Sequence, residues 1–327
     1  MNSLIPMRSI RSIRTSTQVQ PQSTSRIMMI RPVRFAYNEQ TAGSNEFMDA
    51  DFAQETRKIA QEKALEEFEQ MVTVLTAAGV DVTVYEDTVS PYSPDSIFPN
   101  NWVSLHQSGK VVLYPMMAPN RRVERRRDII DDLRERYHVE EIIDLTHFEQ
   151  EGKFLEATGS MVLDRRFKIA YACLSPRTDA EVLDAFARAT GYEVVKFSAF
   201  DDNDVPVYHT NVLMCIGDVF AVVCLEAIKN PDEKFLVRSV LEETGKYIVE
   251  ITMEQMKHFA GNMLLVRTKK DAKLLVMSTS AFQSLSDQQR NALDDYAELI
   301  HTDLSMIEGN GGGSARCMMA EIHLPLK

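Results

Sequence analysis

The sequence has little of what marks several large classes of protein. Its four cysteines, at positions 173, 215, 224 and 317, fit neither a zinc site nor a disulfide framework, so we expect no metal and no cofactor. No apolar run approaches the roughly 20 residues that a membrane-spanning helix needs. Lysine and arginine number 36 against 48 acids, and this net charge of -12 argues against a nucleic-acid or membrane partner. We therefore expect a small-molecule substrate and a reducing, cytoplasmic location.

The first 26 residues differ in composition from the rest of the chain. They are rich in Arg, Ser, Thr and Gln, and the first acid of the whole sequence is Glu39. We interpret residues 1–26 as a flexible N-terminal extension, with an organelle transit peptide as the alternative. Residues 27–327 are long enough and apolar enough to bury one large core, and are predicted to form a single catalytic domain.

From residue 27 onward one pattern repeats: two short strands joined by a tight turn, then a helix, then a third strand. The hairpin strands are predicted at 102–105 and 111–114, 160–163 and 168–173, 211–216 and 220–225, and 262–267 and 273–277. The third strands are predicted at 81–85, 141–145, 193–197, 247–251 and 303–307. Helix signals separate them, including one helical spacing over 47–78 and capping boxes at Thr178-x-x-Glu181 and Ser286-x-x-Gln289.

The repeat predicts a ring. Its turns recur about every 50 to 60 residues, close to the period of a propeller blade, although propeller blades contain no helix. The segment 318–325 is a strand without a hairpin partner, and we expect it to pair with the strand at 27–33. That pairing would close the ring, since circular folds remove free sheet edges. The prediction is an α/β fold of ββαβ modules around a central channel, with the helices outside.

Several chemically capable residues stand where these strands begin. Cys317 follows the glycine-rich run 309–313, which suits backbone that must approach a ligand, although such a cysteine is more often an inert buried thiol. His209 directly precedes an apolar strand, where a lone histidine is usually structural. Asn100 and Asn101 stand side by side in a segment that also reads as a plain turn. Singly, each feature has an ordinary structural explanation.

In their order along the chain, these motifs resemble those of the guanidine-modifying, or pentein, superfamily. The matching segments are Asp95-Ser-Ile-Phe-x-Asn-Asn, Arg121, Leu-Glu156-x-x-Gly, Leu-Ser-x-Arg177-Thr, His209 before its strand, and Cys317 after its glycine run. The group includes arginine deiminase, dimethylarginine dimethylaminohydrolase and glycine amidinotransferase. The resemblance covers nearly all of the chain after residue 26 and implies a five-bladed α/β propeller, in agreement with the five modules.

The same resemblance implies a role for each site residue. Cys317 would be the nucleophile, His209 the general acid and base, and Glu156 the acid that orients His209. The substrate's reacting group would be held by Asp95, Asn100 and Asn101. Its carboxylate would be taken by Arg121 and Arg177, since arginine binds carboxylates in bidentate fashion.

One departure from the family pattern bears on the substrate. In dimethylarginine dimethylaminohydrolase the positions that match Asn100 and Asn101 are acidic, which suits a cationic guanidinium. Amides suit a neutral ureido group instead, because a desolvated cation needs a paired charge. The chain resembles the citrulline-utilising branch, so we predict hydrolysis of citrulline to ornithine, ammonia and carbon dioxide.

Other functions stay open at this point. An arginine deiminase or a dimethylarginine dimethylaminohydrolase would use the same three catalytic residues, and an amidinotransferase would need an amine acceptor in addition. A catalytically silent pentein that only binds a partner is the alternative outside enzymes. Self-association into a homo-oligomer is also left open.

Overall fold

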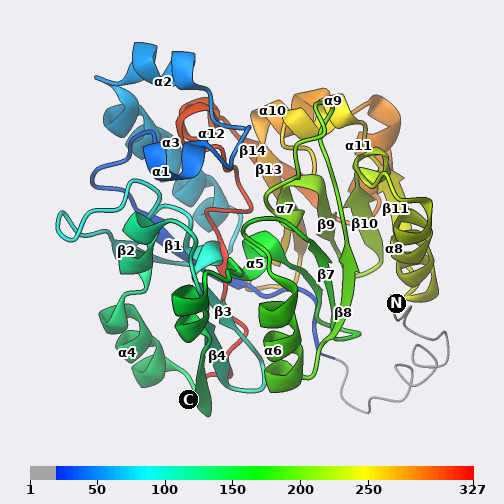
Figure 1. Ribbon diagram of the computed structural model, residues 1–327, viewed down its shortest axis with the longest axis horizontal. Helices are drawn as coiled ribbons and strands as arrows, with labels where there is room; N and C mark the ends of the chain where they lie inside the picture. The colour runs from blue at the N-terminus through cyan, green and yellow to red at the C-terminus, as the bar shows by residue number, and fades with distance from the viewer. Residues whose placement is uncertain (1–19) are drawn as a thin grey trace.

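The computed structural model describes residues 20–327, which form a ring of five three-stranded sheets with helices on the outside (Figure 1). In four modules an antiparallel hairpin leads through a helix to a third strand, which pairs in parallel with the second strand of the hairpin. The predicted ring of five ββαβ modules is confirmed.

These four modules follow one another along the chain. The first has β3 Val103–Leu105, β4 Lys110–Leu113, α4 Arg127–Arg136 and β5 Glu141–Asp144. The next has β6 Val162–Asp164, β7 Ile169–Cys173, α6 Ala180–Thr190 and β8 Glu193–Phe197. Then come β9 Met214–Ile216, β10 Phe220–Val223, α8 Pro231–Glu243 and β11 Tyr247–Glu250. The last has β12 Leu264–Arg267, β13 Lys273–Ser278, α10 Thr279–Ser284, α11 Asp287–Asp294 and β14 Glu298–Thr302.

The fifth module is built from both ends of the chain. Strand β15 (Ala320–Glu321) pairs antiparallel with β1 (Arg26–Arg31), and β1 pairs in parallel with β2 (Asp81–Glu86). Helices α1 (Glu39–Ala42), α2 (Ala50–Thr56) and α3 (Ala60–Ala77) connect β1 to β2. The predicted closure of the ring is confirmed, although β15 is shorter than the expected 318–325.

Four local predictions were wrong. The strand expected at 211–216 begins instead as helix α7 (Thr210–Leu213), and only Met214–Ile216 form β9. The helix expected over 47–78 is divided into α2 and α3, and the exposed Ile59 lies at the break. The N-cap of α6 is Asp179 rather than Thr178, because the Asp179 carboxylate accepts hydrogen bonds from the first backbone N–H groups of the helix. The strand expected at 303–307 is instead β14 at Glu298–Thr302, and the chain then enters helix α12 (Ser305–Gly311).

Ordered structure begins before the predicted boundary at residue 27. The Gln22 amide donates to the Leu163 carbonyl and accepts from the Arg165 N–H, while Thr24 Oγ1 donates to the Ile322 carbonyl. These contacts hold residues 22–26 against the ring. The rest of the expected extension, residues 1–19, lies outside the described residues.

The first strand of each hairpin (β3, β6, β9 and β12) and the last strand of the chain, β15, form the inner edges of the five sheets. Strand β15 lies against β3, and β9 lies against both β6 and β12. A short helical or hairpin turn precedes each of these five strands, and we call these five segments the lead-in turns. They are the 3-10 turn Pro99–Asn101, helix α5 (Ala157–Ser160), helix α7 (Thr210–Leu213), and the turns 258–261 and 315–318. The lead-in turns are central in Figure 1, where α5 and α7 are labelled, and they position the site.

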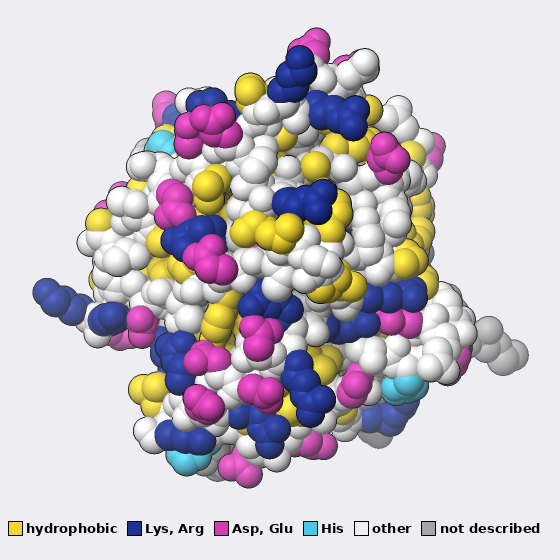
Figure 2. Space-filling view, turned by 90° about the vertical axis from the view of Figure 1, so that its left-hand side faces the viewer, with side chains coloured by type: hydrophobic (Ala, Val, Ile, Leu, Met, Phe, Trp, Pro, Cys, Tyr) yellow, Lys and Arg dark blue, Asp and Glu magenta, His cyan; other side chains and the backbone are white. Residues whose placement is uncertain are grey.

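The outer surface is evenly mixed in charge where Figure 2 shows it, with acidic and basic side chains interspersed. Within residues 20–327, no helix combines the length and the apolar character needed to cross a membrane.

Candidate active site

The lead-in turns bring most of the predicted site residues to one small cavity. The cavity is partly open, and its empty space, counted together with the part open to solvent, is about 250 Å³. Its lining includes six of the eight predicted residues: Asp95, Asn101, Arg121, Arg177, His209 and Cys317. The other two lie behind this lining and are completely buried, Glu156 against His209 and Asn100 against Asn101.

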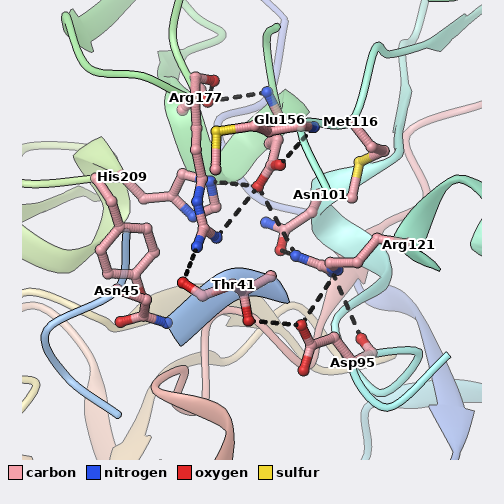
Figure 3. Close-up of polar contacts among 12 residues, drawn as sticks. Thr41, Asn45, Asp95, Asn101, Met116, Arg121, Glu156, Arg177 and His209 are labelled. Carbon is pink, nitrogen blue, oxygen red and sulfur yellow. Dashed lines mark hydrogen bonds and ion pairs between the residues drawn. The ribbon is translucent and has the colours of Figure 1, made fainter. Parts of the chain in front are cut away.

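His209 and Glu156 form a buried pair. His209 is the N-cap residue of α7 and Glu156 that of α5, and His209 Nε2 lies 2.9 Å from Glu156 Oε2 (Figure 3). Burial lowers the pKa of His209 to about 4, although Glu156 opposes the shift. A neutral imidazole that donates from Nε2 to a carboxylate leaves Nδ1 as an unprotonated base. The pair therefore presents a proton acceptor at Nδ1.

Glu156 is kept ionised by its surroundings. Burial alone would raise the pKa of Glu156, but Arg177, His209 and Arg121 together hold it below its ordinary value. The guanidinium groups of Arg177 and Arg121 lie 3.5 and 3.7 Å from Oε2, and the backbone N–H of Met117 donates to Oε1. The carboxylate is thus fixed in charge and in place, and it fixes the tautomer of His209.

Glycine is required where these groups come together. A Cβ atom at Gly159, in α5, would lie 2.4 Å from Asn101 Nδ2 and 2.7 Å from His209 Nδ1. Both distances are shorter than van der Waals contact allows. The glycine of the Leu-Glu156-x-x-Gly motif therefore lets the base and the amide approach each other.

Cys317 lies in the last lead-in turn, and its thiol is buried at the cavity wall. The glycine run before it is not a plain loop. Its first residues end helix α12, and Gly312 caps that helix with a left-handed φ of 60°. Gly311 passes so close to Phe98 that a Cβ atom would lie 2.9 Å from the ring. The run carries backbone, rather than side chains, along the cavity.

The amide pair is connected to Arg121. Asn101 Oδ1 accepts from Arg121 Nη1 at 3.0 Å, and Asn101 Nδ2 donates to Asn100 Oδ1 at 3.0 Å. Asn100 Nδ2 has no hydrogen-bond partner among the described residues, and neither has Asp95 Oδ1. Burial raises the pKa of Asp95, although Arg121 opposes the shift. Buried polar atoms without partners are rare, and Asp95 lines the cavity, so its free oxygen is a candidate for contact with a ligand.

The two arginines differ in how firmly they are held. Arg121 makes a bidentate ion pair with Glu124, with both distances at 2.9 Å. Arg177 donates instead to neutral oxygens, the Thr41 carbonyl and Ser44 Oγ, and its guanidinium lies over the Tyr208 ring. A carboxylate ligand could displace the neutral partners of Arg177 far more easily than the charged partner of Arg121.

The fold and this constellation together decide the family. The chain belongs to the family described as N,N dimethylarginine dimethylhydrolase, eukaryotic, which it matches over residues 31–324. It is thus a pentein, and its class is that of hydrolases that act on carbon–nitrogen bonds. None of the curated proteins compared matches the chain significantly.

Solved structures with the same fold include three structures of two enzymes, ArgZ and DDAH. The N-terminal domain of ArgZ, covalently bound to a reaction intermediate, superposes with a TM-score of 0.71 at 18% identity, covering 92% of this chain and 98% of that domain. Full-length ArgZ, an arginine dihydrolase from cyanobacteria, is 19% identical with a TM-score of 0.71, and this chain spans 41% of its length. DDAH from Pseudomonas aeruginosa, complexed with citrulline, has a TM-score of 0.60 at 17% identity, covering 91% of this chain and 99% of that one. At these identities the likeness establishes the fold.

Sequence reasoning missed several residues at the site. Glu124 lies within an arginine-rich run that reads as a solvated helix face, yet it is buried against Arg121. Thr41 and Ser44, which bind Arg177, come from a polar segment without a recognisable motif. Asn262 donates to Cys317, and its only sequence signal is its place after Gly261, ahead of an apolar strand.

Proposed function

We propose that this protein hydrolyses the ureido group of citrulline, giving ornithine, ammonia and carbon dioxide. The observation that carries the proposal is the chemistry of the cavity wall beside the thiol. Amides surround the reacting centre: Asn101 lines the cavity, and two further amides contact Cys317. A ureido group is neutral and has both N–H donors and a carbonyl acceptor, which amides can satisfy.

A guanidinium would be poorly matched to this wall. The buried carboxylates of Glu156 and Glu124 are already paired with arginines, and only one oxygen of Asp95 is free among the described residues. A guanidinium would also share the cavity with the cationic Arg121 and Arg177. A buried charge without a matching partner is costly, so a neutral reacting group is favoured.

The proposed chemistry uses the Cys317, His209 and Glu156 set. His209 Nδ1 takes the thiol proton, Sγ bonds to the ureido carbon, and the carbon–nitrogen bond to ornithine breaks as His209 returns the proton to that nitrogen. Water then attacks the carbamoyl group left on Cys317, giving one proton to His209. The carbon–sulfur bond breaks, the Cys317 sulfur takes the proton back from His209, and carbamic acid leaves and decomposes to ammonia and carbon dioxide.

We assign the substrate's carboxylate to Arg177, because the partners it would exchange are neutral. Arg121 keeps Glu124 and acts by holding Asn101 and by contributing charge near Glu156. The free oxygen of Asp95 is then available to an N–H group of the substrate.

Arginine deiminase or dimethylarginine dimethylaminohydrolase activity is the second candidate. The family match favours it, as does the carboxylate of Asp95 at the cavity. ArgZ acts on arginine as an arginine dihydrolase, and DDAH has been seen with citrulline bound, so the fold accommodates both kinds of side chain.

A substrate panel separates the candidates. The purified enzyme is given citrulline, arginine, dimethylarginine, and arginine with glycine, and ornithine, citrulline and amine products are measured. We expect kcat/KM for citrulline to exceed that for arginine by at least about tenfold. Citrulline accumulating from arginine or dimethylarginine would support the second candidate instead. Transfer to glycine would indicate an amidinotransferase.

A further inference from the structure

The Cys317 thiol is surrounded by amide donors. Asn262 Nδ2 lies 3.3 Å from Sγ, and Asn211 Nδ2 lies 3.4 Å from it. Both asparagines are completely buried. Among the described residues, no other side chain makes a hydrogen bond to this sulfur within 3.5 Å.

The orientation of the Asn262 amide is set by two backbone groups. Its Oδ1 accepts from the Arg316 N–H at 3.0 Å, and its Nδ2 donates to the Asn211 carbonyl at 2.9 Å. If the amide were flipped, Nδ2 would face the Arg316 N–H and Oδ1 would face the Asn211 carbonyl, and neither hydrogen bond could form. One N–H of Nδ2 is therefore left for Cys317 Sγ, while Oδ1 is farther from the sulfur, at 3.7 Å.

The position of Asn262 in its module also corresponds to the positions of the candidate site residues in the other four modules. The other four lead-in turns, with the residues that flank them, supply Asn101, Glu156, His209 and Cys317. Asn262 directly follows the turn 258–261 of the remaining module. It reaches the thiol because Gly261 packs on the backbone of α7, where a Cβ atom would lie 2.2 Å from the Val212 carbonyl oxygen.

The thiolate needs such donors. Burial lowers the pKa of His209 to about 4, so the imidazole is neutral at neutral pH and does not stabilise a thiolate as a cation would. A neutral ureido substrate brings no positive charge either. The other ionisable groups near the sulfur are Arg316 on its own turn, Tyr208 beside His209, and Asp95, Arg121 and Arg177 across the cavity. Of the nearby cations, Arg316 is paired with Glu321, Arg121 with Glu124, and Arg177 with Glu156.

We propose that Asn262, assisted by Asn211, positions the Cys317 thiolate and stabilises its charge. The two amide N–H groups hold Sγ at the cavity wall and stabilise the anion that forms when the thiol gives up its proton. The proposal rests on Cys317 being the nucleophile of the proposed function, but it does not depend on which substrate is used. Charge-assisted hydrogen bonds of this kind are stronger than neutral ones, so their loss moves the ionisation of the sulfur measurably.

The test is the pH dependence of Cys317 alkylation by iodoacetamide, read by mass spectrometry without any substrate. In Asn262→Ala we expect the midpoint of the rate profile to move upward by about one pH unit or more, and further in Asn262→Asp, whose carboxylate repels the thiolate. Asn310→Asp is the matched control: Asn310 is equally buried, but its amide contacts Thr56 and Met306 instead. Its midpoint should stay at the wild-type value.

A wild-type midpoint in folded Asn262→Asp would overturn the proposal, as would an equal shift in Asn310→Asp. Should Asn262→Asp fail to fold, Asn211→Ala carries the same prediction, because its side chain bonds to Cys317 alone among the described residues. The turnover of Asn262→Ala should also recover at high pH, which a purely structural defect would not do. Because alkylation needs no substrate, its outcome is separate from that of the substrate panel.

Discussion

At the scale of single residues, the site is a set of buried charges that fix one another. Arg177 and Arg121 keep Glu156 ionised, Glu156 holds the Nε2 proton of His209, and His209 therefore offers Nδ1 as the base. The polar groups nearest to the sulfur are uncharged amides. The side-chain hydrogen bonds to the Cys317 sulfur therefore come from neutral groups, although Asp95, Arg121 and Arg177 also line the cavity.

Cys317 and His209 should act as one unit. We expect Cys317→Ser and His209→Ala each to lose more than about 90% of turnover while the fold is retained, because the mechanism requires both a thiolate and a base. The double variant should be no worse than the poorer single variant. The measurement is kcat for the three variants, with circular dichroism to check folding.

His258→Ala is the control for this series, since His258 is exposed and bonds to Ser280. It should keep full activity. Independent, multiplicative losses in the Cys317 and His209 variants would contradict a shared role.

At the scale of elements, the lead-in turns determine how closely the site packs. The turn α5 carries Glu156 at its N-terminus and Gly159 within it, and Gly159 faces both Asn101 and His209. Small displacements of His209 or Asn101 should slow the reaction, because a shift of about 1 Å in a catalytic group can lower the rate roughly 100-fold.

Gly159→Ala should therefore damage catalysis more than stability. We expect kcat to fall at least about tenfold, because the added methyl group must displace His209 or Asn101. Gly43→Ala is the matched control, since a Cβ atom there meets nothing within 4 Å and the backbone is right-handed. Steady-state kinetics and thermal melting of both variants are the measurements. A wild-type kcat in Gly159→Ala would show that the close packing of Gly159 against His209 and Asn101 is not needed for catalysis.

The sequence predicted the repeated elements well, because hairpins, caps and apolar strands are local patterns. The predictions from sequence failed where tertiary contacts determine the secondary structure of a segment. The segment 303–307 has the apolar residues of a strand, yet Glu67 in α3 accepts hydrogen bonds from the backbone of Met306 and Ile307 and so caps a helix there. The expected helix divides at 57–59, where the sequence Arg-Lys-Ile contains no glycine or proline to mark a break.

The site residues divide in the same way. Cys317, His209 and Glu156 stand in motifs with a recognisable order, so they could be predicted from the sequence. Glu124 and Asn262 could not be predicted, because their local sequence is the same as that of an ordinary surface glutamate and an ordinary turn asparagine. Folding of the ring places Glu124 against Arg121 and Asn262 against the Cys317 thiol, and these tertiary contacts make both residues part of the site.

At the scale of the whole molecule, ring closure assembles the site. Cys317 lies three residues before β15, and β15 pairs with β1, so the proposed nucleophile is placed by contacts between the two ends of the described chain. The remaining predicted site residues come from the lead-in turns and the residues beside them (Asn100, Asn101, Glu156 and His209) and from other connections of the modules (Asp95, Arg121 and Arg177). The candidate site therefore exists only in the closed ring.

The central claim is that the amides at the reacting centre select a ureido group over a guanidinium, and Asn101 is one of the amides that line the cavity. The most direct measurement is the ratio of kcat/KM for citrulline to that for arginine, in the wild type and in Asn101→Asp at neutral pH. An aspartate has the same shape but attracts a cation and repels the ureido oxygen, so the ratio should fall by at least about tenfold from a wild-type value that favours citrulline. A wild type that already prefers arginine, or an unchanged ratio in the folded variant, would contradict the account.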